Sequence, residues 1–310
     1  MRYFEQARQF LPNSSQILQS LARVARRRGQ WDRIDSYLNE AERLDPRDVK
    51  LLAMHGSCNG FQRRFPEALR KLDQVLNITP DDVDIIALQA SIAQAEGDLP
   101  RAAALLAPLH PNALEPNALV VQLYQAILER RPASIISRLE EILAKPDPAL
   151  GYGNGDLRFW LGWAQEVAGD HAAAQESWRQ ARSELEAFLK EQPENDSLIN
   201  DLALTNMGLG DKATALALAE RGMAVRPIEK DALIGPRSLE FLARVSAGTG
   251  EPDRATAALQ KLLSISYYGA FPAGALTPAL LRLDSMFDPL RNDPRFQKLA
   301  ASSASKPADK

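Results

Sequence analysis

The amino-acid sequence predicts an all-α solenoid, a chain of helical hairpins in which each hairpin stacks on the next. Pro12, Pro46 and Pro80 lie 34 residues apart, and the residues that precede them repeat in step. A phenylalanine or leucine stands eight residues before each proline, and an alanine or valine stands five residues before it. A fixed period of this length indicates stacked structural units, each of which packs mainly on its two neighbours.

The first complete unit, residues 13–46, contains the apolar stripes of two amphipathic helices. Residues of the first stripe recur at three- and four-residue spacing, namely Leu18, Leu21, Ala22 and Ala25. Gly29 is expected to end this helix, because glycine adopts the left-handed cap conformation without a side-chain clash. The second stripe runs from Trp31 to Ala41, and the pair Asp45-Pro46 ends it, since proline disfavours helical geometry in the preceding residue.

This pattern resembles that of the tetratricopeptide repeat, in which small residues lie where two helices approach, a glycine marks the turn and a proline closes the unit. The corresponding residues here are Ala22, Gly29, Leu38, Ala41 and Pro46. The resemblance implies a right-handed superhelix of about seven hairpins with a C-terminal capping segment. The second unit departs from the pattern at Arg63, where a glycine is expected, so the form of that turn stays open.

The pattern and its interruptions divide the chain into six segments. These are a half repeat with only a second helix at 1–12, an N-terminal sub-stack at 13–144, a linker at 145–156, a C-terminal sub-stack at 157–266, a capping segment at 267–299 and a disordered tail at 300–310. The half repeat indicates either a missing N-terminal portion or a lone helix that serves as a cap. The linker, which is dense in proline and glycine, is either a hinge or a long loop.

The composition argues against several classes of function. A net charge of −3 and a pI near 5.8 do not favour nucleic acid as a partner. The chain has no apolar run near the roughly 20 residues of a membrane span and no signal peptide, so we expect no membrane insertion and a cytoplasmic location. One cysteine excludes an internal disulfide framework, and three dispersed histidines do not indicate a metal site.

Catalytic signatures are missing from the sequence. The stretch that begins at Gly208 superficially resembles a phosphate-binding loop, but aspartate precedes its lysine where glycine is required. The glycines at 151–155 lack the preceding strand of a dinucleotide-binding loop, so we interpret them as part of the linker. We therefore expect neither enzymatic activity nor a cofactor.

The resemblance implies that the first helix of each hairpin forms the inner face, which binds peptides. In the second and third units the inward positions include Ala53, Met54, Ser57, Asp84, Ala87, Leu88 and Ser91. The set of lysines, asparagines and arginine that clamps a C-terminal carboxylate in the chaperone-binding subfamily is broken here. A receptor for chaperone tails is therefore not expected.

Ten residues are candidates for peptide binding in this groove. They are Arg23, Arg26, Arg27, Met54, Phe159, Trp160, Trp163, Asn200, Asp201 and Met207. The three arginines share one helix face and could attract acidic groups, or could form only a solvated charged face. The two tryptophans could anchor a partner, or could pack between hairpins.

These observations predict a non-catalytic scaffold that holds a protein or peptide segment in its groove. An alternative comes from the C-terminal residues 277–299, which resemble the closing segment of tetratricopeptide regions in bacterial multidomain signalling proteins. In such proteins the repeats follow a Ser/Thr kinase, a nucleotide cyclase or a DNA-binding regulator domain. The alternative function is that of a regulatory or sensory arm of such an enzyme, with the catalytic domain outside this chain.

Overall fold

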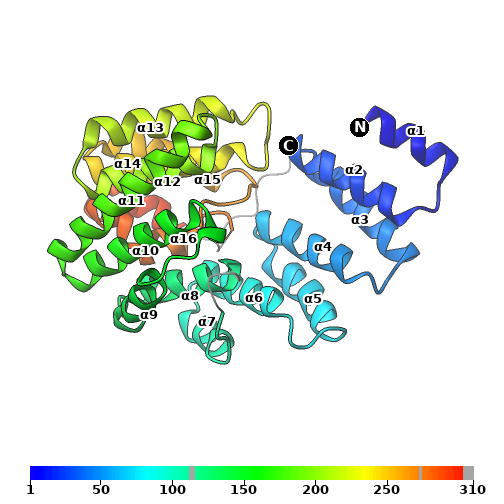
Figure 1. Ribbon diagram of the computed structural model, residues 1–310. Helices are drawn as coiled ribbons and strands as arrows, with labels where there is room; N and C mark the ends of the chain where they lie inside the picture. The colour runs from blue at the N-terminus through cyan, green and yellow to red at the C-terminus, as the bar shows by residue number, and fades with distance from the viewer. Residues whose placement is uncertain (112–115, 272–273, 303–310) are drawn as a thin grey trace.

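The computed structural model describes residues 1–111, 116–271 and 274–302, and within these ranges all regular structure is helical. Fourteen helices form seven antiparallel hairpins, seen as successive pairs along the colour gradient of Figure 1. The pairs are α2 (Ser15–Arg27) with α3 (Trp31–Leu44), α4 (Val49–Phe61) with α5 (Phe65–Leu76), α6 (Val83–Glu96) with α7 (Leu99–Leu106), α8 (Pro116–Leu128) with α9 (Ala133–Leu143), α10 (Gly153–Ala168) with α11 (His171–Glu191), α12 (Asp196–Gly208) with α13 (Lys212–Val225), and α14 (Gly235–Thr249) with α15 (Pro252–Leu263). The prediction of an all-α stack of about seven hairpins is confirmed.

The first hairpin shows why these residues form these elements. Ser14 caps α2, because its hydroxyl accepts a hydrogen bond from the Ile17 amide, and Gly29 takes a left-handed φ of 68° in the turn. Ala22 and Ala41 are fully buried between α2 and α3, where small side chains let the two helices approach closely.

The turn of the second unit has the same backbone form, although it carries arginine in place of glycine. Arg63 adopts φ 58°, in the left-handed region that costs a residue with a side chain on the order of 1 kcal/mol. Arg130, in the turn between α8 and α9, also has φ 58°. Both side chains contact the C-terminal part of the chain, since Arg63 donates a hydrogen bond to the Leu276 carbonyl and Arg130 pairs with Asp288.

The N-terminal helix α1 (Arg2–Phe10) lies outside the hairpins and has no buried residue. It packs on α2, and Arg8 forms a 2.7 Å ion pair with Glu40 of α3. Tyr3 and Phe10 are each 83% exposed, so this helix presents aromatic side chains to solvent.

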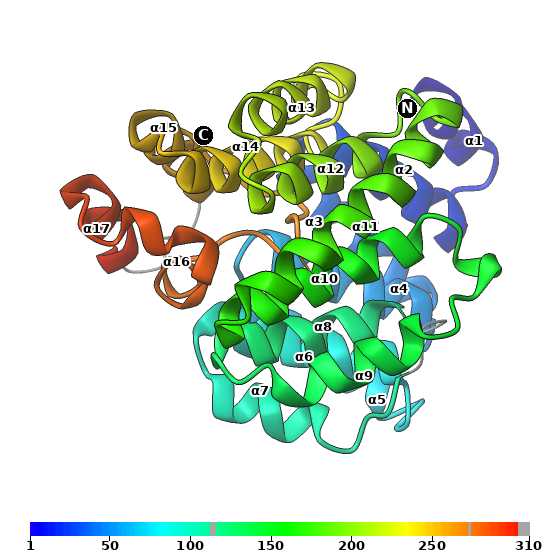
Figure 2. The same cartoon turned by 60° about the vertical axis from the view of Figure 1, so that its left-hand side comes forward.

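After α15 the chain crosses the inner side of the stack in an irregular stretch, which we call the crossing segment (residues 264–271 and 274–277). In Figure 1 this orange segment lies between the yellow-green hairpins and the blue-cyan ones. It leads to α16 (Pro278–Leu283), the 3-10 helix η2 (Ser285–Leu290) and α17 (Pro294–Ala301), and α17 packs against α15 (Figure 2). Phe287 and Phe296, which belong to the predicted capping segment, are buried with ring centroids 6.1 Å apart.

Other predicted segments lie as follows. Residues 145–156 contain the 3-10 turn η1 (Pro148–Leu150) and the first turn of α10. The predicted disordered tail is described only as far as residue 302, and residues 303–310 lie outside the described residues. In the described part of the chain no helix combines the length and the apolar character that crossing a bilayer requires.

The stack curves until its first hairpin touches the loop between α13 and α14. The Ala232 amide donates a 2.8 Å hydrogen bond to the Arg27 carbonyl, and the Arg27 guanidinium pairs with Asp231. This contact joins residues that are about 200 positions apart in the sequence, so the inner side of the stack is enclosed.

Candidate functional site

The first helices of six hairpins surround a cavity of about 390 Å³ on the inner side of the stack. Its wall comes from α4, α6, α8, α10, α12 and α14, and residues of the crossing segment close one side. Six residues that the tetratricopeptide pattern places inward contribute to this wall, namely Ala53, Ser57, Asp84, Ala87, Leu88 and Ser91. The inner cavity is the candidate functional site.

Two carboxylates and one guanidinium interrupt the otherwise mainly apolar wall. Asp156 of α10, Asp201 of α12 and Arg237 of α14 line the inner cavity, and Asp84 of α6 is exposed at its edge. No hydrogen bond from the described residues reaches the side-chain oxygens of Asp156 or Asp201, whose pKa values respond only to burial and to nearby charges.

Burial controls the protonation of this pair. It raises the pKa of Asp156 to about 6, against the opposing effect of Arg237. It also raises the pKa of Asp201 well above its usual range, and the negative charge of Asp156 adds to this increase. The pair therefore retains a proton to higher pH than two solvent-exposed aspartates would, and this proton can be exchanged with a ligand.

An aromatic cluster lies beside the inner cavity and joins the hairpins to the crossing segment. Phe271 of the crossing segment contacts Trp160, Trp163, Tyr124 and Phe241, with ring centroids 5.2, 5.3, 5.5 and 6.0 Å away. Trp160 and Trp163 are only 2% and 3% exposed. Both tryptophans thus pack within the protein as the sequence-based alternative described, and Trp160 also contributes to the cavity wall.

Arg63 holds the crossing segment against the stack. Its guanidinium donates hydrogen bonds to the carbonyl oxygens of Leu276, Ile265 and Leu262 at 2.8, 2.8 and 2.9 Å. Burial lowers the pKa of this arginine, and Tyr267 and Glu240 oppose the effect. These hydrogen bonds tie the end of α15 and two carbonyl groups of the crossing segment to the turn between α4 and α5.

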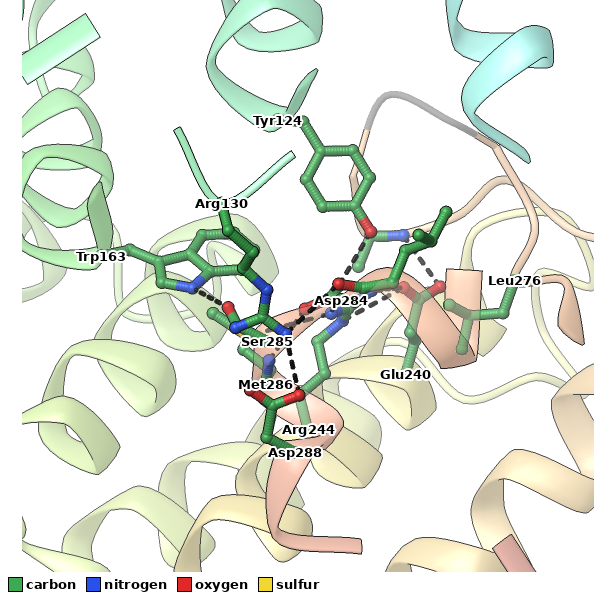
Figure 3. A network of polar contacts seen from close by, with 12 residues as sticks. Tyr124, Arg130, Trp163, Glu240, Arg244, Leu276, Asp284, Ser285, Met286 and Asp288 are labelled. Atoms are coloured by element: carbon green, nitrogen blue, oxygen red, sulfur yellow. Dashed lines mark hydrogen bonds and ion pairs between the residues drawn. The ribbon is translucent and has the colours of Figure 1, made fainter. Parts of the chain in front are cut away.

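A fully buried charged network lies next to the hydrogen bonds of Arg63 (Figure 3). Arg244 pairs with Glu240 at 2.8 Å and with Asp284 at 2.5 Å, and Tyr124 donates a 2.7 Å hydrogen bond to the same Asp284. Burial would lower the pKa of Arg244, but Asp284 and Glu240 raise it above its usual range. Every charge has a partner, so the network fixes the C-terminal part in place and leaves no group free for a ligand.

The predicted arginines do not line the inner cavity. Arg23 is exposed, Arg26 is partly buried with no partner for its Nε, and Arg27 pairs with Asp231 at the contact that encloses the stack. The structure does not bring these three arginines together with the cavity residues.

The remaining predicted residues lie at different places. Met54 packs against the core of the first hairpin, and Phe159 is buried beside the two tryptophans. Asn200 is fully buried, where its amide donates a 3.2 Å hydrogen bond to Ser238, and Met207 lines a separate hollow with Trp163. Of the ten candidates, Trp160 and Asp201 line the inner cavity.

Sequence reasoning missed Asp156, Arg237 and Arg63. Asp156 was assigned to the end of the linker, although it lies in the first turn of α10. An arginine at a turn position where glycine is expected was the one available signal for Arg63, because a residue under backbone strain commonly has compensating contacts. In the part of the chain that the structure describes, no three metal-ligating side chains are grouped around a possible metal position.

Comparison with known proteins supports the repeat assignment in the first hairpin. Residues 17–50 match the tetratricopeptide repeat family. This stretch comprises most of α2 with all of α3, and the pattern that predicted it includes Ala22, Gly29 and Pro46. No curated protein matches the chain in sequence.

Several solved structures are similar to this chain over most of its length. A tetratricopeptide repeat protein from Parabacteroides merdae is 15% identical over 92% of this chain and 97% of its own, with a TM-score of 0.49. PilW, a type IV pilus biogenesis factor, is 15% identical over 80% of this chain and 91% of its own, with a TM-score of 0.35. The tetratricopeptide domain of P58(IPK) is 12% identical over 92% of this chain and 96% of its own, with a TM-score of 0.30.

Proposed function

We propose that this protein is a non-catalytic scaffold that binds a short protein or peptide segment in the inner cavity. The observation that carries the proposal is the cavity itself, which is about 390 Å³ in volume and is walled by one face of six successive hairpins. Cavities of this size that combine apolar walls with a few polar groups are typical ligand sites. A few side chains of an extended segment would fill it, whereas a folded domain would not enter.

The proposal includes a protein partner and a cytoplasmic location, both of which are expectations from the sequence analysis. Trp160 contributes to the wall as a buried side chain, so binding depends on the shape of the cavity more than on exposed aromatic anchors. The regulatory arm of a larger signalling enzyme stays a sequence-based hypothesis, and no feature of the described residues favours it.

A cavity-filling substitution tests the proposal. Gly60 lies in the cavity wall, and a Cβ atom added there would meet no other atom within 4 Å, so Gly60→Phe should fold and obstruct the cavity. Ser183→Phe on α11 adds the same ring at an exposed position outside the cavity and serves as the matched control.

The experiment is a selection of randomised peptides displayed on phage against the purified full chain and both variants. The proposal expects peptides that bind the wild type and Ser183→Phe, and that lose at least about tenfold in affinity for Gly60→Phe. Peptides that bind Gly60→Phe as well as the wild type would place the binding surface elsewhere and contradict the proposal.

A further inference from the structure

The charges in the inner cavity are unbalanced. Asp84, Asp156 and Asp201 line it, and Arg237 is the only basic side chain among the described lining residues. The carboxylates are hydrogen-bond acceptors when ionised, and among the described residues the one side chain that donates to any of them is the Asn117 amide, 3.4 Å from Asp84. The wall thus offers acceptors that the described residues leave without donors.

Arg237 does not neutralise the two inner carboxylates by direct contact. None of its guanidinium nitrogens lies within 4.0 Å of a carboxylate oxygen of Asp156 or Asp201. Its guanidinium carbon lies 5.6 Å from the centre of the Phe241 ring, and its buried Nε has no hydrogen-bond partner. A cation supplied by a ligand would therefore meet acceptors that no other group occupies.

We propose that the inner cavity receives a lysine side chain of the bound segment, with the carboxylates of Asp156 and Asp201 as acceptors for its ammonium group. This inference rests on the proposed function and names the chemistry of the ligand. A lysine side chain matches the cavity in two ways. Its apolar stem suits the aliphatic and aromatic wall around Leu88 and Trp160, and its ammonium supplies three donors.

A second guanidinium fits less well, because Arg237 already occupies the aromatic face of Phe241 on which a planar guanidinium would stack. An anionic ligand fits worse, since it would meet three carboxylates and one guanidinium. Charge complementarity therefore favours the compact ammonium group.

Binding of the ammonium group should release a proton. Asp201 is faced by Asp156 from α10, by Arg237 from α14, by Asp196 of its own helix and by the Tyr152 hydroxyl, while Tyr268 and Asp84 lie elsewhere in the wall. Asp196 is paired with Arg226 at 2.9 Å, so its charge is compensated. A ligand cation favours the ionised form of Asp201, so the affinity should rise with pH as the pair of carboxyls loses its proton.

The phage selection described above also tests this inference. We expect the selected peptides to share a lysine at one position, in excess over the unselected library. The best peptide is then titrated calorimetrically into the wild type, Asp201→Asn and the control Glu186→Gln, which makes the same chemical change on the exposed side of α11. A thermal melt of each variant verifies folding.

Three measurements support the inference together. Acetylation of the shared lysine weakens binding by at least about tenfold, Asp201→Asn does the same, and Glu186→Gln leaves the affinity unchanged. The proton release, measured in buffers of different ionisation enthalpy, disappears in Asp201→Asn.

The contrary outcomes separate the two proposals. Selected peptides that lack a shared lysine, or that bind equally well after acetylation of it, overturn the lysine inference. If these peptides still lose affinity for Gly60→Phe, the proposal of a peptide-binding scaffold is supported. Selection of no peptide above the level obtained with Gly60→Phe overturns both.

Discussion

Replacement of Asp156 by asparagine should stabilise the protein at neutral pH, because this carboxyl is partly buried in the cavity wall and none of the described residues donates a hydrogen bond to it. Burial raises its pKa from the ordinary 3.8 to about 6. Above pH 6 the aspartate is ionised in both states, and the folded state bears the full cost. This increase in the pKa corresponds to about 3 kcal/mol of stability lost at neutral pH, at about 1.36 kcal/mol for each tenfold change in the ionisation constant.

The sign of the pH dependence follows from the same shift. Well below pH 3.8 the carboxyl is protonated in both states and resembles an asparagine, so the substitution changes little. Between pH 4 and pH 6 the unfolded chain loses the proton first, and the wild type loses stability relative to Asp156→Asn as the pH rises. The expected gain of the variant is about 1 kcal/mol at pH 4.5 and about 3 kcal/mol at pH 7.5.

Urea denaturation followed by circular dichroism measures this difference at the two pH values. Glu186→Gln is the control, since an exposed carboxylate with no described partner should give no gain at either pH. A gain for Asp156→Asn that is equal at pH 4.5 and pH 7.5, or a loss of stability at pH 7.5, would refute the reasoning and show that the carboxylate has a stabilising partner in the folded state.

Other substitutions test the contacts that hold the C-terminal part of the chain. Arg244→Met leaves two buried carboxylates without their cation and should cost about 3–5 kcal/mol in urea denaturation, and an unchanged midpoint would contradict the burial of the network. Arg63→Gly relieves the left-handed backbone strain but removes three hydrogen bonds to carbonyl groups, so the free energy of unfolding should fall by at least about 2 kcal/mol. A gain in stability would show that the backbone strain outweighs these hydrogen bonds. Arg27→Ala should cost less than about 1 kcal/mol because that side chain is largely exposed, and Asp231→Ala should cost more, since Asp231 also accepts hydrogen bonds from the amides of Leu233 and Ile234.

The architecture followed from the sequence because its determinants are local. Each hairpin needs two apolar stripes, a turn residue and small residues at the helix contact, and all of these lie within one 34-residue unit. The form of the turn at Arg63 could not be predicted. The hydrogen bonds that offset its backbone cost are donated by Arg63 to carbonyl groups about 200 residues further along the chain.

The candidate site was predictable only in part, for a similar reason. The repeat register placed Ala87, Leu88 and Ser91 on the inner face, where they lie. The register could not show that the chain would return across this face and bury Trp160 and Trp163 under Phe271. The pairing of Asp156 with Asp201 in one wall depends on the packing of α10 against α12, which no local pattern encodes.

The most direct test of the central claim is a photo-crosslinking measurement of where a selected peptide binds. A benzophenone amino acid replaces Asp84, which is exposed at the edge of the inner cavity, or Glu186 on the outer helix α11. Binding in the inner cavity predicts a covalent adduct with the peptide from position 84 and none from position 186. An adduct from position 186 together with none from position 84 would contradict it.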